Sequence, residues 1–270
     1  MLSLLDFSMF RQAGDEIIRM DYGRRVLIDA LDAARRPDSY AVMLLDMSAA
    51  KAFREEYRKK HGVSLATIHL IIKAVALTIE KEPWLNQMVD GYKIIKPSTI
   101  NVSVSVAAKE TITPVVVIQE ANKKSLKEIS AELKRKASEA IEKEKEILER
   151  LDRLARWMPL NFVRRHLVRF LVKQYRLRRA VLGTVQITSL GLKDLAFHLP
   201  SHMGTTMLVS VGGVTPRPVV AGDRIEIRPT AYIAFQVDQR VMNAVEGVKC
   251  FRRFRRLLEH PAELEDSNEG

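Results

Sequence analysis

The sequence predicts a single α/β domain, and three observations support this prediction. Apolar residues alternate or run continuously, as in strands, over residues 100–118 and again after residue 184. Segments with helical spacing alternate with these strands, which is typical of helices packed on a sheet. The 270 residues are 47% hydrophobic and 29% charged, so the chain can bury a core, and we find no repeat, low-complexity linker or clear boundary.

The individual elements follow from the spacing of apolar residues along the chain. In order, we expect helical spacing within residues 1–36, a buried strand over 40–47, helices from 48 and from 64, strands between 93 and 118, a long charged helix over 125–156, a basic helical stretch over 161–179, strands over 184–190, 207–211, 224–228 and 231–237, and a last helix over 244–258.

Local signals indicate where several elements begin and end. Ser48 is expected to cap one helix, which Gly62 stops, and Ser64 is expected to open the next, which Pro83 closes. That helix is hydrophobic almost all round and is therefore expected to be buried. The Gly-Asp pair at 222–223 suits a two-residue hairpin turn before the strand at 224.

Charge and cysteine content restrict the classes of partner and compartment. The net charge of +11 and the isoelectric point near 9.8 favour a polyanionic partner, such as nucleic acid, an anionic membrane or a phosphate-rich ligand. Cys250 is the single cysteine, so no disulfide can form within the chain and a reducing compartment is expected. Its helical surroundings favour packing over a nucleophilic role. The sequence begins without the features of a signal peptide and has no apolar stretch that would span a bilayer, so we expect a cytoplasmic protein.

Three segments carry motifs that point to a family. The first is the apolar helix that begins at Val63 and ends in Pro-Trp-Leu-Asn at 83–86. The second joins Ile-Asn-Val-Ser-Val at 100–104 to Lys-Ser-Leu-Lys-Glu-Ile at 124–129. The third pairs Val-Gln-Ile-Thr-Ser-Leu-Gly at 185–191 with Asp-Gln-Arg-Val-Met-Asn-Ala at 238–244. In this order and spacing they resemble the catalytic domain of the 2-oxoacid dehydrogenase (dihydrolipoamide) acyltransferases, over most of residues 24–260.

The resemblance implies a fold, an assembly and a partner. The fold would be the chloramphenicol acetyltransferase-like two-layer sandwich, a mixed sheet with helices packed on it, in a trimer with active-site channels between subunits. Residues 1–23 would form an N-terminal extension, which leaves no room for the family's lipoyl and subunit-binding domains. We therefore expect any acyl-carrying arm to come from an external lipoyl or acyl-carrier protein. Residues 261–270 are polar and acidic, so we expect a flexible tail and a free trimer, not a cage.

Acyl transfer between thiols needs a base for the attacking thiol and a hydrogen-bond donor for the oxyanion of the tetrahedral intermediate. In the family this base is the histidine of an Asp-His-Arg motif, and the donor is a serine or threonine from the adjacent subunit. The matching residues here are Gln239 and Thr188. A glutamine amide cannot take the proton. Loss of a positioned base typically costs about 10²- to 10⁴-fold in rate.

Other residues near these positions have both a catalytic and a structural interpretation. Asn243 keeps the polar residue of the motif, but it also begins a capping box with Glu246 at the start of the last helix. Asp238 and Arg240 are expected to support the site by ion pairing. Two histidines that follow the Thr188 strand, His198 and His202, are candidates for a substitute base or are surface residues of a loop; without cysteines or paired carboxylates they do not predict a metal site.

A basic insertion relative to the family is expected at about residues 144–183. It interleaves many arginines with apolar residues, and Pro159 is expected to divide it into two helices. Through Trp157, Phe162 and Phe170 with the neighbouring arginines, it suits contact with a membrane surface. The alternative is that the apolar stripe packs on its own trimer. Nucleic acid is the least favoured partner, because no reading motif accompanies the charge.

Two classes of function therefore remain open. The first is an acyltransferase that acts on thioesters of coenzyme A or of a lipoyl or carrier group, with weak or altered catalysis because of Gln239 and with no tightly bound cofactor. The second is a non-catalytic trimer that binds an acyl thioester, a partner protein or a membrane surface. In both cases the protein would be cytoplasmic or peripheral to the membrane.

Overall fold

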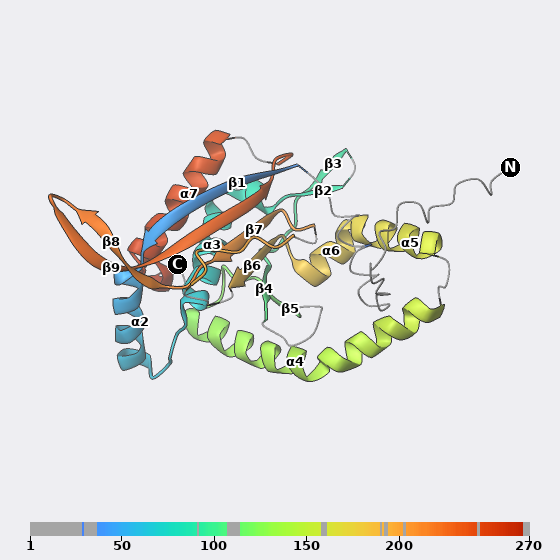
Figure 1. Ribbon diagram of the computed structural model, residues 1–270, viewed down its shortest axis with the longest axis horizontal. Helices are drawn as coiled ribbons and strands as arrows, with labels where there is room; N and C mark the ends of the chain where they lie inside the picture. The colour runs from blue at the N-terminus through green and yellow to red at the C-terminus, as the bar shows by residue number, and fades with distance from the viewer. Residues whose placement is uncertain are drawn as a thin grey trace, which may run out of the picture.

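The computed structural model describes residues 29, 37–90, 92–106, 114–157, 161–189, 191, 194–201, 204–241 and 244–266. Strands and helices alternate along these ranges, as the apolar spacing predicts (Figure 1). The expected helical spacing within residues 1–36 lies outside the described residues, apart from Asp29, which is helical.

A mixed sheet forms the centre of the molecule. Its strands lie in the order β1-β9-β7-β6-β4-β5, and β8 pairs with the other part of β9. Strand β4 is parallel to β6 and β6 to β7, whereas the other pairs are antiparallel. The strands span Asp38–Asp46 (β1), Val102–Ser105 (β4), Val115–Ile118 (β5), Val185–Ser189 (β6), Met207–Val211 (β7), Thr215–Ala221 (β8) and Arg224–Asp238 (β9), and a separate two-stranded sheet joins β2 (Met88–Asp90) to β3 (Lys93–Ile95).

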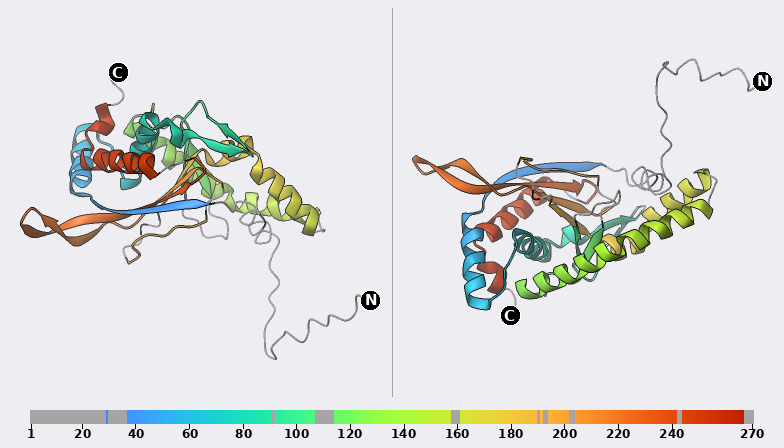
Figure 2. Two further views of the ribbon diagram at one scale, coloured as in Figure 1. Left: turned by 90° about the horizontal axis from the view of Figure 1, so that it is seen from above. Right: turned by 60° about the horizontal axis from the view of Figure 1, so that its bottom comes forward.

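Helices cover one face of the central sheet, which gives the expected two layers (Figure 2). Helix α3 (Thr67–Lys81) contacts α4 (Leu126–Trp157) on one side and α7 (Ala244–Glu259) on another, while α2 (Ser48–His61) contacts α3 and α7. On β1 the residues Tyr40, Val42 and Leu44 are exposed, and Leu45 is buried in the core. The α/β class and the mixed sheet with helices packed on it are therefore confirmed.

Helix α3 lies at the centre of the helical layer. Ten consecutive residues from Leu70 to Ile79 are buried, as the all-round apolar sequence predicts. Among them is Lys73, whose ammonium donates hydrogen bonds to the carbonyl oxygens of Asn122 (2.7 Å) and Lys124 (2.8 Å). These bonds satisfy a buried cation and hold the loop before α4 against α3.

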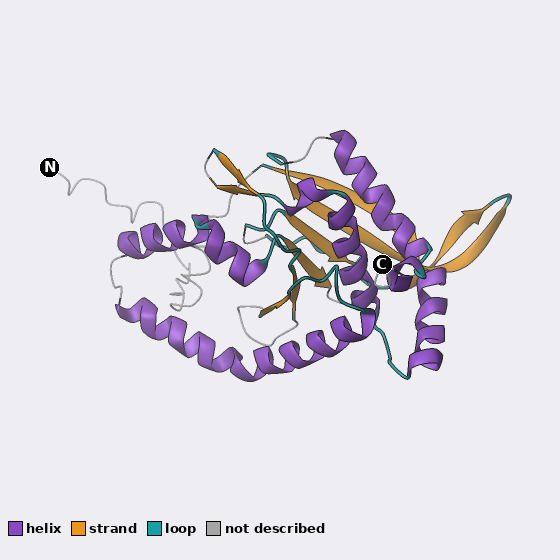
Figure 3. Cartoon of the chain, turned by 180° about the vertical axis from the view of Figure 1, so that it is seen from behind, coloured by secondary structure: helices purple, strands orange, loops and turns teal. Residues whose placement is uncertain are grey.

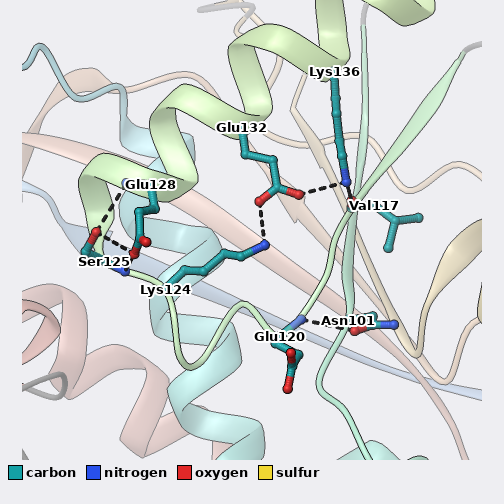
Figure 4. A network of polar contacts seen from close by, with 8 residues as sticks. All are labelled: Asn101, Val117, Glu120, Lys124, Ser125, Glu128, Glu132 and Lys136. Carbon is teal, nitrogen blue, oxygen red and sulfur yellow. Dashed lines mark hydrogen bonds and ion pairs between the residues drawn. The ribbon is translucent and has the colours of Figure 1, made fainter.

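The beginning of α4 is held by a network of polar contacts (Figure 4). Ser125 and Glu128 form a capping box, in which the Ser125 N–H donates to Glu128 Oε2 (2.8 Å) and the Glu128 N–H to Ser125 Oγ (3.2 Å). One turn later Glu132 pairs with both Lys124 and Lys136. Lys136 also donates to the carbonyl oxygen of Val117, which ties α4 to β5.

Beyond this network, α4 extends away from the sheet and the chain returns through two further helices (Figure 3). These are α5 (Asn161–Lys173) and α6 (Tyr175–Leu182), and α6 packs on β5 and β2. The basic stretch expected as one helix over 161–179 is therefore two helices, separated at Gln174. Pro159 lies outside the described residues. None of the helices in the described ranges is long and apolar enough to cross a membrane.

Two predicted helix starts are wrong. Helix α2 begins at Ser48 as its first residue, and the side chain that accepts the Ser48 N–H is Asp46 (2.9 Å), so Ser48 is not the cap. Helix α3 begins at Thr67, three residues after Ser64. The intervening Leu65 is buried, and its carbonyl accepts a hydrogen bond from Arg54 (2.6 Å), which holds this segment outside the helix.

The strand prediction missed β8 and divided β9. The prolines at 216 and 218 argue against a strand, but β8 lies at the edge of the sheet, where a residue without an N–H is tolerated. Pro229 does not interrupt β9. Its register partner in β8 is Pro216, which also lacks an N–H, and its carbonyl oxygen still accepts the N–H of Met47 (2.8 Å). The hairpin turn at 222–223 is confirmed, with Gly222 at φ 67°.

The prediction of a flexible tail over 261–270 is wrong for its described part. Residues Glu263–Asp266 form the short helix α8, and Leu264 is fully buried against the core. Glu265 pairs with His61 (2.9 Å) and Lys60 (3.4 Å) of α2. One apolar side chain and two ion pairs therefore hold a segment whose composition alone suggested mobility.

Candidate functional site

Thr188 lies near the carboxyl end of β6 and lines a small hollow. The side chain is almost fully buried, and its hydroxyl makes no hydrogen bond to any residue that the structure describes. The hollow lies among the ends of β6 and β7 and the 191–198 segment, with room for about one water molecule. A hydroxyl beside such a hollow, with no partner in the described part of the chain, can donate a hydrogen bond to a ligand atom.

His198 lines the same hollow as Thr188. Its carbonyl oxygen accepts a hydrogen bond from Ser210 Oγ (2.5 Å) on β7, and the neighbouring Phe197 ring lies tilted against Tyr232, with 6.3 Å between the ring centroids. A side chain at Gly212 would place its Cβ 2.0 Å from the Ala196 carbonyl oxygen, so this loop can approach the sheet only over a glycine. Of the two candidate histidines, His198 is therefore close to Thr188 in the same chain, while His202 lies outside the described residues.

The motif that contains Gln239 lies where β9 ends. Asp238 is buried, and its carboxylate pairs with the Arg240 guanidinium (2.7 Å) and accepts the Arg240 N–H (3.1 Å). The hydrogen bond that the Arg240 guanidinium donates to Asp238 is the first cause of the raised pKa of Arg240. This pair lies within the turn that contains Gln239. The backbone N–H of Gln239 donates to the Pro37 carbonyl oxygen (3.0 Å), and Gln239 is exposed. Asp238 and Arg240 form the expected ion pair.

Within one chain the two halves of this predicted site do not meet. Thr188 lies opposite Ser210 of β7, and Ser210 lies opposite Ala234 of β9. Gln239 follows Ala234 by five residues, which corresponds to about 17 Å along the strand direction. The Thr188 hydroxyl and the Gln239 amide therefore lie at opposite ends of the sheet.

Arg178 of α6 is a residue near the Gln239 turn that sequence reasoning counted only as part of the basic insertion. Its guanidinium donates to the carbonyl oxygens of Val89 (2.7 Å) and Gly204 (3.2 Å). Burial is the largest cause of the lowered pKa of Arg178, and the charges of Asp238 and Arg240 also act on it. No sequence signal separates Arg178 from its neighbours, because its role depends on the packing of α6 against β2.

The remaining candidates have no described role in a reaction. Asn243 lies outside the described residues, so both its catalytic and its capping interpretation stay predictions. Cys250 is buried, and burial raises the pKa of its thiol to about 12, which agrees with packing and not with a nucleophile. In the described ranges no group of His, Cys, Asp and Glu side chains could hold a metal ion.

Comparison with known proteins identifies the family of this chain. The model of the 2-oxoacid dehydrogenases acyltransferase (catalytic domain) family matches residues 12–149 and 172–265. The chain is 27% identical over 257 residues to the dihydrolipoyllysine-residue succinyltransferase component of the 2-oxoglutarate dehydrogenase complex of Bartonella vinsonii subsp. berkhoffii, covering 93% of this chain and 55% of the relative. A similar relative in Staphylococcus aureus is 24% identical over 221 residues, covering 81% of this chain and 45% of the relative. The chain thus spans about half the length of the curated relatives it matches.

Solved structures have the same fold. Dihydrolipoamide acetyltransferase of Azotobacter vinelandii superposes with a TM-score of 0.71 at 20% identity, covering 96% of this chain and 97% of the other. A truncated catalytic core of the 2-oxoacid dehydrogenase multienzyme complex of Thermoplasma acidophilum superposes with a TM-score of 0.66 at 19% identity, covering 92% and 99%. The family match over most of the chain and the shared fold give one answer: the chain belongs to the acyltransferase catalytic-domain family of the 2-oxoacid dehydrogenases.

Proposed function

We propose that this protein transfers acyl groups between thioesters of coenzyme A and of a lipoyl group, at a site that two copies of the chain form together. The observation that carries the proposal is the position of Thr188. It lines a hollow at one end of the sheet, and its hydroxyl makes no hydrogen bond to a described residue, while Gln239 lies at the other end. A reaction that needs both positions requires a second copy. The expected trimer, in which the Thr188 end of one copy faces the Gln239 end of the next, meets this requirement.

Comparison with relatives supports these assignments. The Azotobacter vinelandii acetyltransferase was investigated for the role of a serine, a histidine and an asparagine in its catalytic mechanism. In that protein the asparagine follows the histidine by four positions, as Asn243 follows Gln239 here. The serine precedes the histidine by nearly the same number of positions as Thr188 precedes Gln239. We infer that Thr188 takes the place of the serine and Gln239 that of the histidine.

The reaction assigns a separate task to each end of the site. The attacking thiol loses its proton to a base, and the thiolate adds to the thioester carbonyl. The carbonyl oxygen becomes an oxyanion that accepts a hydrogen bond from the Thr188 hydroxyl, and the intermediate collapses to expel the second thiolate, which is then protonated. A preorganised donor of this kind typically contributes about 10²- to 10³-fold in rate.

The site lacks a general base at the position of Gln239. The Gln239 amide can orient a thiol but cannot take its proton near neutral pH. A coenzyme A thiol that behaves like cysteine, with a pKa of about 8.5, ionises unaided only in small part. His198 lies on the hollow beside Thr188 and is the substitute base that the geometry favours. We therefore expect weak turnover, with His198 as base or with no base.

The test is thiol exchange between acyl-coenzyme A and dihydrolipoamide, with acetyl and succinyl groups among the acyl donors. We expect slow turnover that falls about 10²-fold in Thr188→Val, which removes the hydroxyl at nearly constant volume. Thr188→Ser keeps the donor and is the matched control. Turnover should rise in Gln239→His, because the base is restored, and fall in His198→Gln if His198 acts in its place.

The same measurements decide between catalysis and the non-catalytic alternative. The alternative is favoured by the glutamine at position 239, which cannot act as a base. No exchange by the natural protein, with activity in Gln239→His, would mean a trimer that binds a thioester or a partner without turning it over. Exchange that is equal in Thr188→Val and in the natural protein would reject Thr188 as the oxyanion donor. A mass of one chain in solution at working concentration would reject the shared site.

A further inference from the structure

Helix α5 differs from the rest of the molecule in the way its side chains are arranged. It lies at the far end of the molecule from the β8–β9 hairpin, beyond the edge of the central sheet (Figures 1 and 3). Its large apolar residues point outward: Phe162 is 63% exposed and Phe170 60%, and Val163, Leu167 and Leu171 are also exposed. Folding of this chain therefore leaves a helical apolar surface in contact with water.

The inward face of α5 explains why these residues cannot turn inside. Arg164 is 4% exposed, and its guanidinium pairs with the buried carboxylate of Asp29 (2.8 Å). Asp29 also pairs with Arg165 (3.0 Å). A rotation of α5 that buried Phe170 would expose this pair and break it, at the cost of leaving charges without their partner. The ion pair thus sets the orientation in which the apolar stripe faces outward.

The outer surface of α5 places cations beside its apolar residues. At 100° per residue, Val163, Leu167 and Phe170 share one stripe, and Arg169 and Lys173 flank it about 80–120° round the helix, on the side that also carries Phe162. From Asn161 to Leu182 the chain has no Asp or Glu and has seven basic residues: Arg164, Arg165, Arg169, Lys173, Arg176, Arg178 and Arg179. Such a helix suits a partner that is negatively charged and accepts apolar side chains.

We propose that the outer face of α5 docks on the surface of an anionic lipid bilayer. The apolar stripe would enter the boundary between headgroups and acyl chains, and the flanking cations would contact the headgroups. The α5 helix of a second copy fits this face poorly, because two such basic helices repel each other. Residues 150–171 also fall outside the family match, so the shared catalytic fold does not require this surface for its own assembly. The proposal is independent of whether the acyltransferase site is active.

The direct test is sedimentation of the whole protein with vesicles. One set contains phosphatidylcholine alone, and the other contains about one third phosphatidylglycerol. We expect binding to the anionic vesicles at least tenfold tighter than to the neutral ones, and loss of that binding near 1 M salt, where the Debye length is about 3 Å. In Phe162→Ser/Phe170→Ser the affinity for anionic vesicles should fall at least tenfold, and in Arg169→Gln/Lys173→Gln it should fall several-fold.

A matched control and the solution mass make each outcome decisive. Val220→Ser/Ile227→Ser removes two apolar side chains of the β8–β9 hairpin that are at least as exposed as Phe162 and Phe170, and this variant should bind vesicles as the natural protein does. Equal loss in the control, equal binding to both kinds of vesicle, or no vesicle binding at all would overturn the proposal. A smaller assembly in Phe162→Ser/Phe170→Ser would instead assign the face to contacts between copies, and binding only to an acidic protein would assign it to that partner.

Discussion

Helices α3 and α5 are built from similar residues but lie in opposite environments. Both are rich in large apolar side chains, and each buries one cation. In α3 the apolar residues are inside, and Lys73 is held by two backbone carbonyl oxygens. In α5 the apolar residues are outside, and Arg164 is held by the carboxylate of Asp29. The difference shows that apolar content does not decide which way a helix faces; the fixed polar partner and the neighbouring layers do.

The two helices also differ in their relation to the family. Helix α3 packs between α4 and α7 in the helical layer, within the part of the chain that the family match covers. Most of α5 falls in the gap of that match at 150–171. The core helix therefore serves the shared fold, whereas the outer helix is an addition whose apolar face no described residue of this chain covers. Three measurements test this contrast.

The largest effect is expected when a buried side chain of α3 is shortened. Ile71→Ala should lower the free energy of unfolding by about 2–5 kcal/mol, because Ile71 is fully buried and its removal leaves a cavity. Denaturant unfolding of the natural protein and the variant measures this loss. A loss below about 1 kcal/mol would mean that α3 is not packed as the structure has it.

A smaller effect is expected from pH, through the half-buried His69 in the first turn of α3. Burial is the first cause that lowers its pKa, to about 4, and the charge of Arg54 adds to it. Between the ordinary value of 6.5 and about 4, the unfolded chain binds the proton more tightly than the folded one. Stability should therefore fall as the pH drops through this window.

The variant His69→Gln tests this assignment. A glutamine can still accept the Ala66 N–H that now donates to His69 Nδ1 (3.0 Å), but it has no group that titrates in this range. Unfolding measured from pH 7 to pH 4 should give a flatter profile for His69→Gln than for the natural protein. Identical profiles would mean that His69 is not the group responsible.

The smallest effect is expected from α5. Phe170→Ala should change the free energy of unfolding by no more than about 0.5 kcal/mol, because the ring lies largely in water. Measured beside Ile71→Ala, this variant compares an outer and an inner apolar side chain in one protein. A loss similar to that of Ile71→Ala would contradict the contrast and mean that something covers the ring in the folded assembly.

Apolar spacing was sufficient to predict most of the fold. It identified α3 as a buried helix and α4 and α7 within a residue of their ends, whereas the mixed sheet was predicted from the resemblance to the family. It failed at Ser48, where the neighbouring Asp46 accepts the N–H in place of a Ser48 cap, and at Pro229, whose carbonyl oxygen accepts from the distant Met47. The tail was also mispredicted, because one buried residue, Leu264, outweighs its acidic composition.

The motif residues of the site can be identified from the amino-acid sequence, because their order and spacing lie along one chain: Thr188, and Gln239 between Asp238 and Arg240. Their arrangement in space depends on the fold. Strand register places Thr188 and Gln239 at opposite ends of the sheet, and a close approach over Gly212 brings His198 to the Thr188 hollow. The fold also decides that the apolar side of α5 faces outward. The reason is that motif spacing is local, whereas register, ion pairing and burial depend on residues that the chain brings together only when it folds.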